Sequence, residues 1–294
     1  MKKSLTAAAL VAVTATALAT AATAAAVPGT VSGDGGDRIA VVKGDGTALV
    51  KEGPLYSAWA VEGDGVKQIV VAGNRIGLLK DNGSVLVKEG DLSAPWTVAA
   101  DNVKQIALSG DRVGIVKGDG TALVKEGPLY SAWTLEGESV KELQLSGDRI
   151  GILKGNGTAL VKEGPLYSAW TVEADRTTHL ALSGNRIGVL RGNGTALVKE
   201  GALGAQWTVE AEDAIQLELS RDRIGVLKDD GTALVKEGAL GAQWTVEGDS
   251  IIQIALSGNR IGIVKDTGAA YVKEGPLYAP WTVEADNVTE LALS

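Results

Sequence analysis

The sequence predicts an all-β fold, a seven-bladed β-propeller made of seven four-stranded repeats of 37 residues. One observation is a unit that recurs seven times without an insertion from Asp37 to Ser294. A second is the content of each unit, in which runs rich in Val, Ile, Leu and Thr alternate with Ser-Gly-Asp/Asn-Arg and Gly-Asn/Asp-Gly turn signals. A third is that no helical periodicity competes with these strand signals. Four-stranded antiparallel units repeated in this way are typical of a propeller, in which each sheet packs face to face on its neighbours.

One tryptophan marks the same position of every repeat. The repeats are residues 37–73, 74–110, 111–147, 148–184, 185–221, 222–258 and 259–294, and the last lacks only its final residue. Their tryptophans are Trp59, Trp96, Trp133, Trp170, Trp207, Trp244 and Trp281, each 37 residues from the next. A repeat of this length holds four strands of about six residues and four short connections.

The strands of one blade are predicted at residues 104–109, 112–117, 121–126 and 133–136. Two-residue turns at Gly110-Asp111 and Asp119-Gly120 would join the first three. With these turns, one face of the blade carries bulky residues and the other carries small ones, so that the bulky face of each sheet meets the small face of a neighbour. The same register places Glu126 on one face and both Arg112 and Lys125 on the other, which predicts ion pairs of Glu with Arg or Lys between blades.

The two ends of the repeat region are expected to close the ring. The region begins with the second strand of a blade, at Arg38, and ends with a first strand at residues 290–294. The first and second strands share the shortest turn, so the C-terminal strand is expected to pair into the N-terminal blade. A straight solenoid is the rival, but neither end of the array has the polar capping unit that an open array needs.

The N-terminal segment has the pattern of a secretory signal peptide. Lys2 and Lys3 precede an Ala-, Leu-, Val- and Thr-rich stretch that ends in small residues at Ala26. We therefore expect a signal peptide over 1–26, a linker over 27–36 and an extracellular, secreted protein. An uncleaved membrane anchor is the alternative reading of this segment.

The amino-acid composition excludes several kinds of functional site. The chain has no Cys and one His, which excludes a disulfide framework and a zinc site built from Cys or His, and we expect neither a metal nor a cofactor. The net charge of −8 argues against nucleic acid as a partner. His179 takes a position that other repeats fill with Gln or Glu, which favours repeat drift over catalysis. Glu142, Glu218 and Glu290 are the carboxylates that an enzyme in the channel would use, but near-identical repeats do not favour a catalytic site, so we expect no enzyme.

The aromatic residues are the candidate binding residues. The tryptophans would either fill the wedge between blades or stack on the C–H face of a sugar ring. A tyrosine precedes the tryptophan by three residues in four repeats, and a Tyr–Trp clamp there would bind carbohydrate. The predicted carbohydrate-binding residues are Trp59, Trp96, Trp133, Trp170, Trp207, Trp244, Trp281, Tyr56, Tyr130, Tyr167 and Tyr278.

The repeat unit "Arg-Ile-Gly…Gly-Asn-Gly-Thr…Lys-Glu-Gly…Trp", which covers residues 37–294, resembles that of bacterial seven-bladed propeller lectins with tandem repeats and, more loosely, tachylectin-type propellers. That resemblance implies sugar pockets between adjacent blades. The predicted function is a secreted, multivalent lectin that binds glycans on a cell surface or a polysaccharide without inserting into a membrane. A non-catalytic scaffold for protein interactions is the alternative, and a glycan-active enzyme in the channel is a further one.

Overall fold

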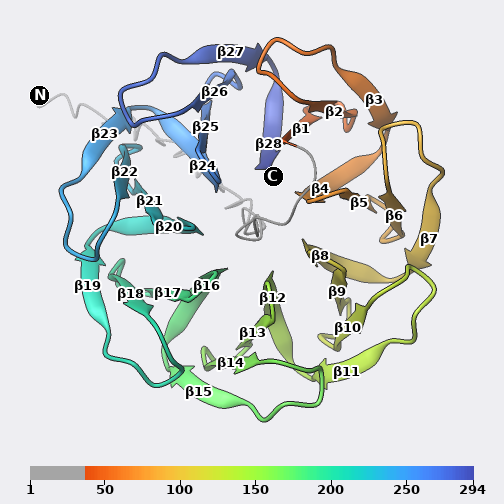
Figure 1. Cartoon of the computed structure of the whole chain (residues 1–294), viewed down its shortest axis with the longest axis horizontal. Coiled ribbons are helices and arrows are strands. Elements are labelled where there is room, and N and C mark those ends of the chain that lie inside the picture. The colour runs from red at the N-terminus through yellow and green to blue at the C-terminus, as the bar shows by residue number, and fades with distance from the viewer. Residues whose placement is uncertain (1–36) are drawn as a thin grey trace, which may run out of the picture.

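The computed structural model describes residues 37–294, which form seven four-stranded antiparallel sheets arranged as a ring (Figure 1). We name the sheet β28-β1-β2-β3 blade A and the following sheets, in chain order, blades B to G. The predicted signal peptide and linker, residues 1–36, lie outside the described residues. Within the described range there is no helix long and apolar enough to cross a membrane.

Each blade runs from an inner strand near the ring axis to an outer strand at the circumference (Figure 1). The inner strands are β4 (Val66–Ala72), β8 (Val103–Ser109), β12 (Val140–Ser146), β16 (Thr177–Ser183), β20 (Ala214–Ser220), β24 (Ile251–Ser257) and β28 (Val288–Leu293). The second strands are β1 (Arg38–Lys43), β5 (Arg75–Lys80), β9 (Arg112–Lys117), β13 (Arg149–Lys154), β17 (Arg186–Arg191), β21 (Arg223–Lys228) and β25 (Arg260–Lys265). The third strands are β2 (Ala48–Glu52), β6 (Val85–Glu89), β10 (Ala122–Glu126), β14 (Ala159–Glu163), β18 (Ala196–Glu200), β22 (Ala233–Glu237) and β26 (Ala270–Glu274). The outer strands are β3 (Ala60–Gly63), β7 (Thr97–Ala100), β11 (Thr134–Gly137), β15 (Thr171–Ala174), β19 (Thr208–Ala211), β23 (Thr245–Gly248) and β27 (Thr282–Ala285).

The predicted fold and its closure are confirmed. Strand β28, at the C-terminal end, pairs antiparallel with β1, and Ile39 lies opposite Leu293. The Ser294 N–H also donates to the Arg38 carbonyl oxygen over 3.0 Å. Blade A therefore combines three N-terminal strands with one C-terminal strand, as Figure 1 shows where β1, near the red end of the colour scale, lies beside the blue β28.

One predicted turn is wrong, and the error changes which residues share a face. Strands β9 and β10 pair Val116 with Ala122, so their connection is the three-residue loop 118–120 and not a two-residue turn. Gly120 takes a positive φ of +87°, as the last residue of such a loop requires. Because a register shift of one residue moves every side chain of a strand to the other face, residues Ala122, Val124 and Glu126 change sides relative to the prediction. The outer strand also starts one residue later than predicted, since Trp133 lies just before β11.

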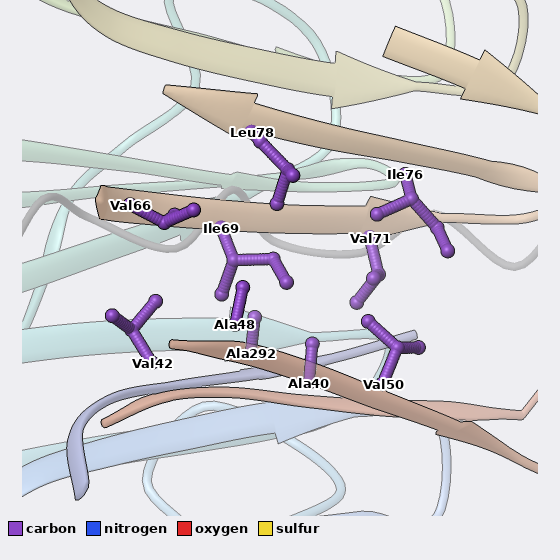
Figure 2. Packing of buried hydrophobic residues seen from close by; sticks show 10 residues of the cluster. All are labelled: Ala40, Val42, Ala48, Val50, Val66, Ile69, Val71, Ile76, Leu78 and Ala292. Carbon is purple, nitrogen blue, oxygen red and sulfur yellow. The ribbon is translucent and has the colours of Figure 1, made fainter. Parts of the chain in front are cut away.

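The blades pack a small face against a bulky one, as predicted. Figure 2 shows the interface between blades A and B, where Ala40, Ala48 and Ala292 face Ile69 and Leu78. These side chains are buried and leave each wedge filled.

The small face includes a glycine at which a Cβ would crowd side chains of the next blade. A Cβ on Gly114 would lie 2.6 Å from Leu143 Cδ2 and 3.1 Å from Leu145 Cδ1 of blade D. Blade A instead has Ala40 at this position, and it packs beside Ile69 and Val71 of blade B. The extra methyl group in blade A is thus matched by a smaller residue, Val71, in the position that Leu145 occupies in blade D.

Candidate functional site

The predicted aromatic residues lie in the loop between the third and outer strands of each blade, which we call the rim loop. The rim loops are residues 53–59, 90–96, 127–133, 164–170, 201–207, 238–244 and 275–281. Each begins at a glycine with positive φ, such as Gly127 at +89°, which turns the chain away from the third strand. In blade C, the Ser131 N–H donates to the Pro128 carbonyl oxygen over 2.9 Å. This hydrogen bond closes a β-turn whose third residue is Tyr130.

An arginine of the preceding blade fixes the start of each rim loop. Arg75 of blade B donates from Nη2 to the Gly127 carbonyl oxygen of blade C over 2.7 Å. It also donates from Nε to Glu89 Oε2, across the strand pair of its own blade, over 3.0 Å. The predicted inter-blade Arg–Glu pair is therefore wrong, because the three-residue hairpin places this glutamate opposite the arginine on one face of the same sheet. The contact between blades is made to a backbone carbonyl instead.

Lysine forms the ion pair between blades, with a glutamate that sequence reasoning did not select. Lys162 on β14 pairs with Glu136 on β11 of the preceding blade, and both side chains are almost fully buried. Lys162 Nζ also donates to the Leu166 carbonyl oxygen in its own rim loop. Equivalent buried pairs join Lys51 to Glu284, Lys88 to Glu62, Lys199 to Glu173, Lys236 to Glu210 and Lys273 to Glu247.

The tryptophans are partly buried between blades, and a lysine lies over each ring. Trp133 packs against an apolar cluster that includes Leu79 of blade B and Val113 of blade C. Lys125 Nζ lies 4.7 Å from the centre of the Trp133 ring. The same cation–π contact joins Lys51 to Trp59, Lys88 to Trp96, Lys162 to Trp170, Lys199 to Trp207, Lys236 to Trp244 and Lys273 to Trp281. Each tryptophan therefore fills the wedge between two blades and shields a buried ammonium group. Sugar stacking on these rings stays a prediction.

The tyrosines lie at the surface. Tyr56, Tyr130, Tyr167 and Tyr278 are 89–90% exposed, so their rings are too exposed to pack against the tryptophans as a closed clamp. They belong to blades A, C, D and G. The equivalent residue is Ser93 in blade B and glycine in blades E and F. The tyrosines therefore follow an arc from blade G through blades A, C and D, interrupted at blade B, and blades E and F also have none.

The inner strands form a second repeated set of contacts, around the ring axis. Gln105 on β8 donates from Nε2 to the Leu143 carbonyl oxygen of blade D over 3.1 Å and accepts from the Leu143 N–H over 2.9 Å. Gln253 makes the same pair of bonds with Leu291 of blade A. Each glutamine thus connects the inner edge of its blade to the next blade.

His179 takes part in this set of contacts and does not act as a free base. Its Nδ1 lies 3.1 Å from Glu142 Oε1 of the preceding blade, and its Nε2 lies 3.1 Å from the Leu217 carbonyl oxygen of the next. Burial alone disfavours the imidazolium, but the Glu142 carboxylate, its hydrogen bond to the ring and the charge of Glu218 outweigh burial and raise the pKa of His179 to about 9. The protonated ring donates from both nitrogens, so neither nitrogen is left to accept a proton from a substrate.

Two further carboxyls on the inner strands are also buried. Burial raises the pKa of Glu218 to about 8, against the opposing charge of His179. Burial likewise raises the pKa of Glu290 to about 8, against its hydrogen bond from the Ile69 N–H. Sequence reasoning singled out these three carboxylates and doubted that any two converge. The structure gathers Glu142 and Glu218 around His179 and leaves Glu290 on blade A.

Sequence reasoning missed the lysine–glutamate pairs of the rim. The signal was present, because Thr-Val-Glu or a close variant follows the tryptophan in most repeats. The error in the hairpin register hid it, since that register already supplied a partner for Lys125. Within residues 37–294, no group of three or more His, Asp or Glu side chains is arranged to hold a metal ion.

Comparison with known proteins supports the fold. No protein-family model matches the sequence, and no curated protein is similar to it. Yeast RCC1 (Prp20) in a structure bound to Kap60 is 10% identical over 87% of this chain and 85% of that chain, with a TM-score of 0.63. Human WBSCR16 is 11% identical over 81% of this chain and 86% of that chain, with a TM-score of 0.62. The chain shares the β-propeller fold with them. A second structure of Prp20p, from Saccharomyces cerevisiae, is 10% identical over 76% of this chain and 79% of that chain, with a TM-score of 0.61, and is described with its binding to Gsp1p and histones.

Proposed function

We propose that the protein is a non-catalytic interaction scaffold that binds a protein partner along the tyrosine-bearing arc of its rim. The exposure of the four tyrosines carries this proposal, since each is 89–90% exposed on an anchored loop. Tyrosine supplies a large contact area at a low cost in conformational entropy and is enriched where proteins meet. The binding of Gsp1p and histones by Prp20p shows that a propeller of this shape serves such a role in another protein.

The rigidity of the rim loops supports binding. In blade C, the Arg75 guanidinium of blade B and the internal hydrogen bond from Ser131 to Pro128 hold the loop on both sides of Tyr130. A loop that is already ordered loses little entropy when a partner binds. Several such loops on one ring add avidity when the partner presents repeated motifs.

The proposed scaffold is non-catalytic because of the contacts that the inner strands make around the ring axis. His179 uses both ring nitrogens in contacts between blades, so neither nitrogen is free to exchange a proton with a substrate. Glu218 is buried beside His179 and accepts a hydrogen bond from Gln216 of its own strand. We also propose that the protein is exported, because residues 1–26 have the pattern of a signal peptide. Sequencing the N-terminus of the exported protein tests this proposal.

Carbohydrate binding is the second candidate, and the same tyrosines would carry it. A tyrosine ring that is 89% exposed, as in Tyr56, offers a face for the C–H groups of a sugar. The tryptophans support this candidate less, because one side of each ring is occupied by lysine. The two candidates predict different ligands for one surface.

One variant tests both candidates. Replacing Tyr56, Tyr130, Tyr167 and Tyr278 with Ser copies the natural residue of blade B, Ser93, and leaves the turn intact. Its binding to extracellular proteins and to a glycan array is compared with that of the unchanged chain. A control carries Val209→Thr and Val246→Thr, which alter exposed residues of blades E and F outside the rim loops.

The expected result is a protein partner that the control retains and the tyrosine variant loses. A partner held equally by the tyrosine variant contradicts the rim proposal. If the unchanged chain binds a saccharide on the array and the tyrosine variant does not, the ligand of the rim is a glycan and not a protein.

A further inference from the structure

One of the seven inter-blade rim contacts lacks its carboxylate. Strand β7 of blade B reads Thr-Val-Ala-Ala, whereas β15 of blade D reads Thr-Val-Glu-Ala. Ala99 therefore stands where the other six outer strands have the glutamate that pairs with a lysine of the next blade. The lysine of the next blade, Lys125, is retained. The interface between blades B and C thus keeps the cation and has lost the anion.

Lys125 is buried although no carboxylate neutralises it. The residue is 3% exposed, and its Nζ donates to the Leu129 carbonyl oxygen and lies over the Trp133 ring. Within residues 37–294, Lys125 makes no ion pair. Burial and then the positive charge of Arg75 lower the pKa of Lys125. A buried ammonium group without a counterion is unfavourable.

Arg75 is the second cation at this interface. It is 3% exposed, and Glu89 pairs with its Nε and Nη2. The remaining nitrogen, Nη1, is buried and has no hydrogen-bond partner, as is also the case in the six equivalent arginines. In the next blade, the charge of the equivalent Arg112 acts against the rise in the pKa of Glu136, after that of Lys162, although Arg112 Nη1 and Glu136 Oε1 have no hydrogen-bond partner. The position that Ala99 leaves without a carboxylate therefore lies beside one buried cationic group, Lys125, and within the field of a second, Arg75.

We propose that this interface binds a small monocarboxylate beside Lys125, within the field of Arg75, at the place that a glutamate carboxylate occupies in the other six interfaces. The part of a glutamate side chain beyond Cβ has the size of an acetate ion, so acetate beside Ala99 restores the missing group atom for atom. Ala99 is only partly buried, which leaves a route for a small ion from solvent. The bound carboxylate accepts from the lysine ammonium group, as Glu136 does from Lys162.

Titration calorimetry with acetate tests the proposal, with chloride at matched ionic strength as the reference. The unchanged chain is expected to bind one acetate. The Ala99→Glu variant has a side-chain carboxylate at this interface, as the other six interfaces do, and is expected to bind no acetate. Glu136→Ala copies the natural arrangement at the next interface and is expected to bind two. Benzoate is the size control and is expected not to bind, because its ring does not fit where a glutamate side chain packs.

The three stoichiometries make each outcome decisive. The proposal is overturned if the unchanged chain does not bind acetate. This holds at the highest acetate concentration for which ionic strength can be matched. Equal binding by the unchanged chain and by Ala99→Glu also overturns it, since acetate then binds elsewhere. If Glu136→Ala fails to fold, the comparison with Ala99→Glu still decides. The rim tyrosines take no part, so this test and that of the proposed function fail independently.

Discussion

Glu290 Oε2 on β28 accepts a hydrogen bond from the Ile69 N–H on β4 over 3.0 Å, and the other carboxylate oxygen is buried without a partner. At the equivalent contact in blade G, Gln253 both accepts and donates. A protonated Glu290 has the donor that the carboxylate lacks. The contact between blades A and B is therefore complete only in the acid form.

Replacing Glu290 with Gln is expected to stabilise the ring as pH rises. The pKa of Glu290 is raised from 4.5 to about 8, so the folded chain binds the extra proton and loses stability as pH increases from 4.5 through 8. Glu290→Gln removes this loss and is expected to gain on the order of 5 kcal/mol above pH 8, and little near pH 4.5. Urea denaturation at both pH values measures the difference. The reciprocal Gln253→Glu is expected to make stability more sensitive to alkali. Equal gains at both pH values would contradict the assignment.

The pair of Glu142 and His179 is expected to behave as one unit. Because the pKa of His179 is raised to about 9, its charged form stabilises the fold below pH 6.5, and this contribution is lost as pH rises through 9. His179→Gln alone leaves Glu142 buried without its cation and is expected to cost about 3 kcal/mol. Adding Glu142→Gln copies the neighbouring pair Gln68 and Gln105, so the double variant is expected to recover most of the loss. Chemical denaturation from pH 6 to 10 follows both effects, and additive losses would show that the two residues are independent.

Gly114→Ala is expected to destabilise the contact between blades C and D by about 2 kcal/mol, since the new Cβ lies 2.6 Å from Leu143 Cδ2. Adding Leu143→Ile and Leu145→Val reproduces the arrangement of Ala40 with Ile69 and Val71, and is expected to restore part of the stability. The midpoint of thermal unfolding reports both steps. If the two added changes worsen the loss, the natural pairing in blade A is not a compensation.

Removing residues 288–294 is expected to abolish cooperative folding, because it deletes β28 and opens the ring at blade A. The truncated chain would expose the β1 edge and the small face that packs on blade B. Circular dichroism and protease resistance compare it with a circular permutant that begins at Val288 and keeps all strands. A truncated chain that unfolds with the same midpoint as the full chain would exclude a stabilising role for closure.

Much of the fold could be predicted from the sequence because it depends on period and local pattern. The spacing of tryptophans set the number of blades, and alternating apolar runs with turn residues set the strands to within one residue in blade C. The contacts of the candidate site were harder to predict from the sequence. Tyr130 was placed correctly at the surface, but the partners of Lys125, Arg112 and Glu126 depend on whether one hairpin has two or three residues, and the turn sequence did not distinguish them.

The sequence by itself determined the repeat number, the order of the strands and the closure of the ring, because each follows from a regular pattern along the chain. Only the tertiary structure decided that the tryptophans lie beneath buried lysines, that His179 spans three blades and that Ala99 leaves Lys125 without a carboxylate. Those facts depend on contacts between side chains of different blades, about 37 residues apart in the chain, which no local pattern encodes.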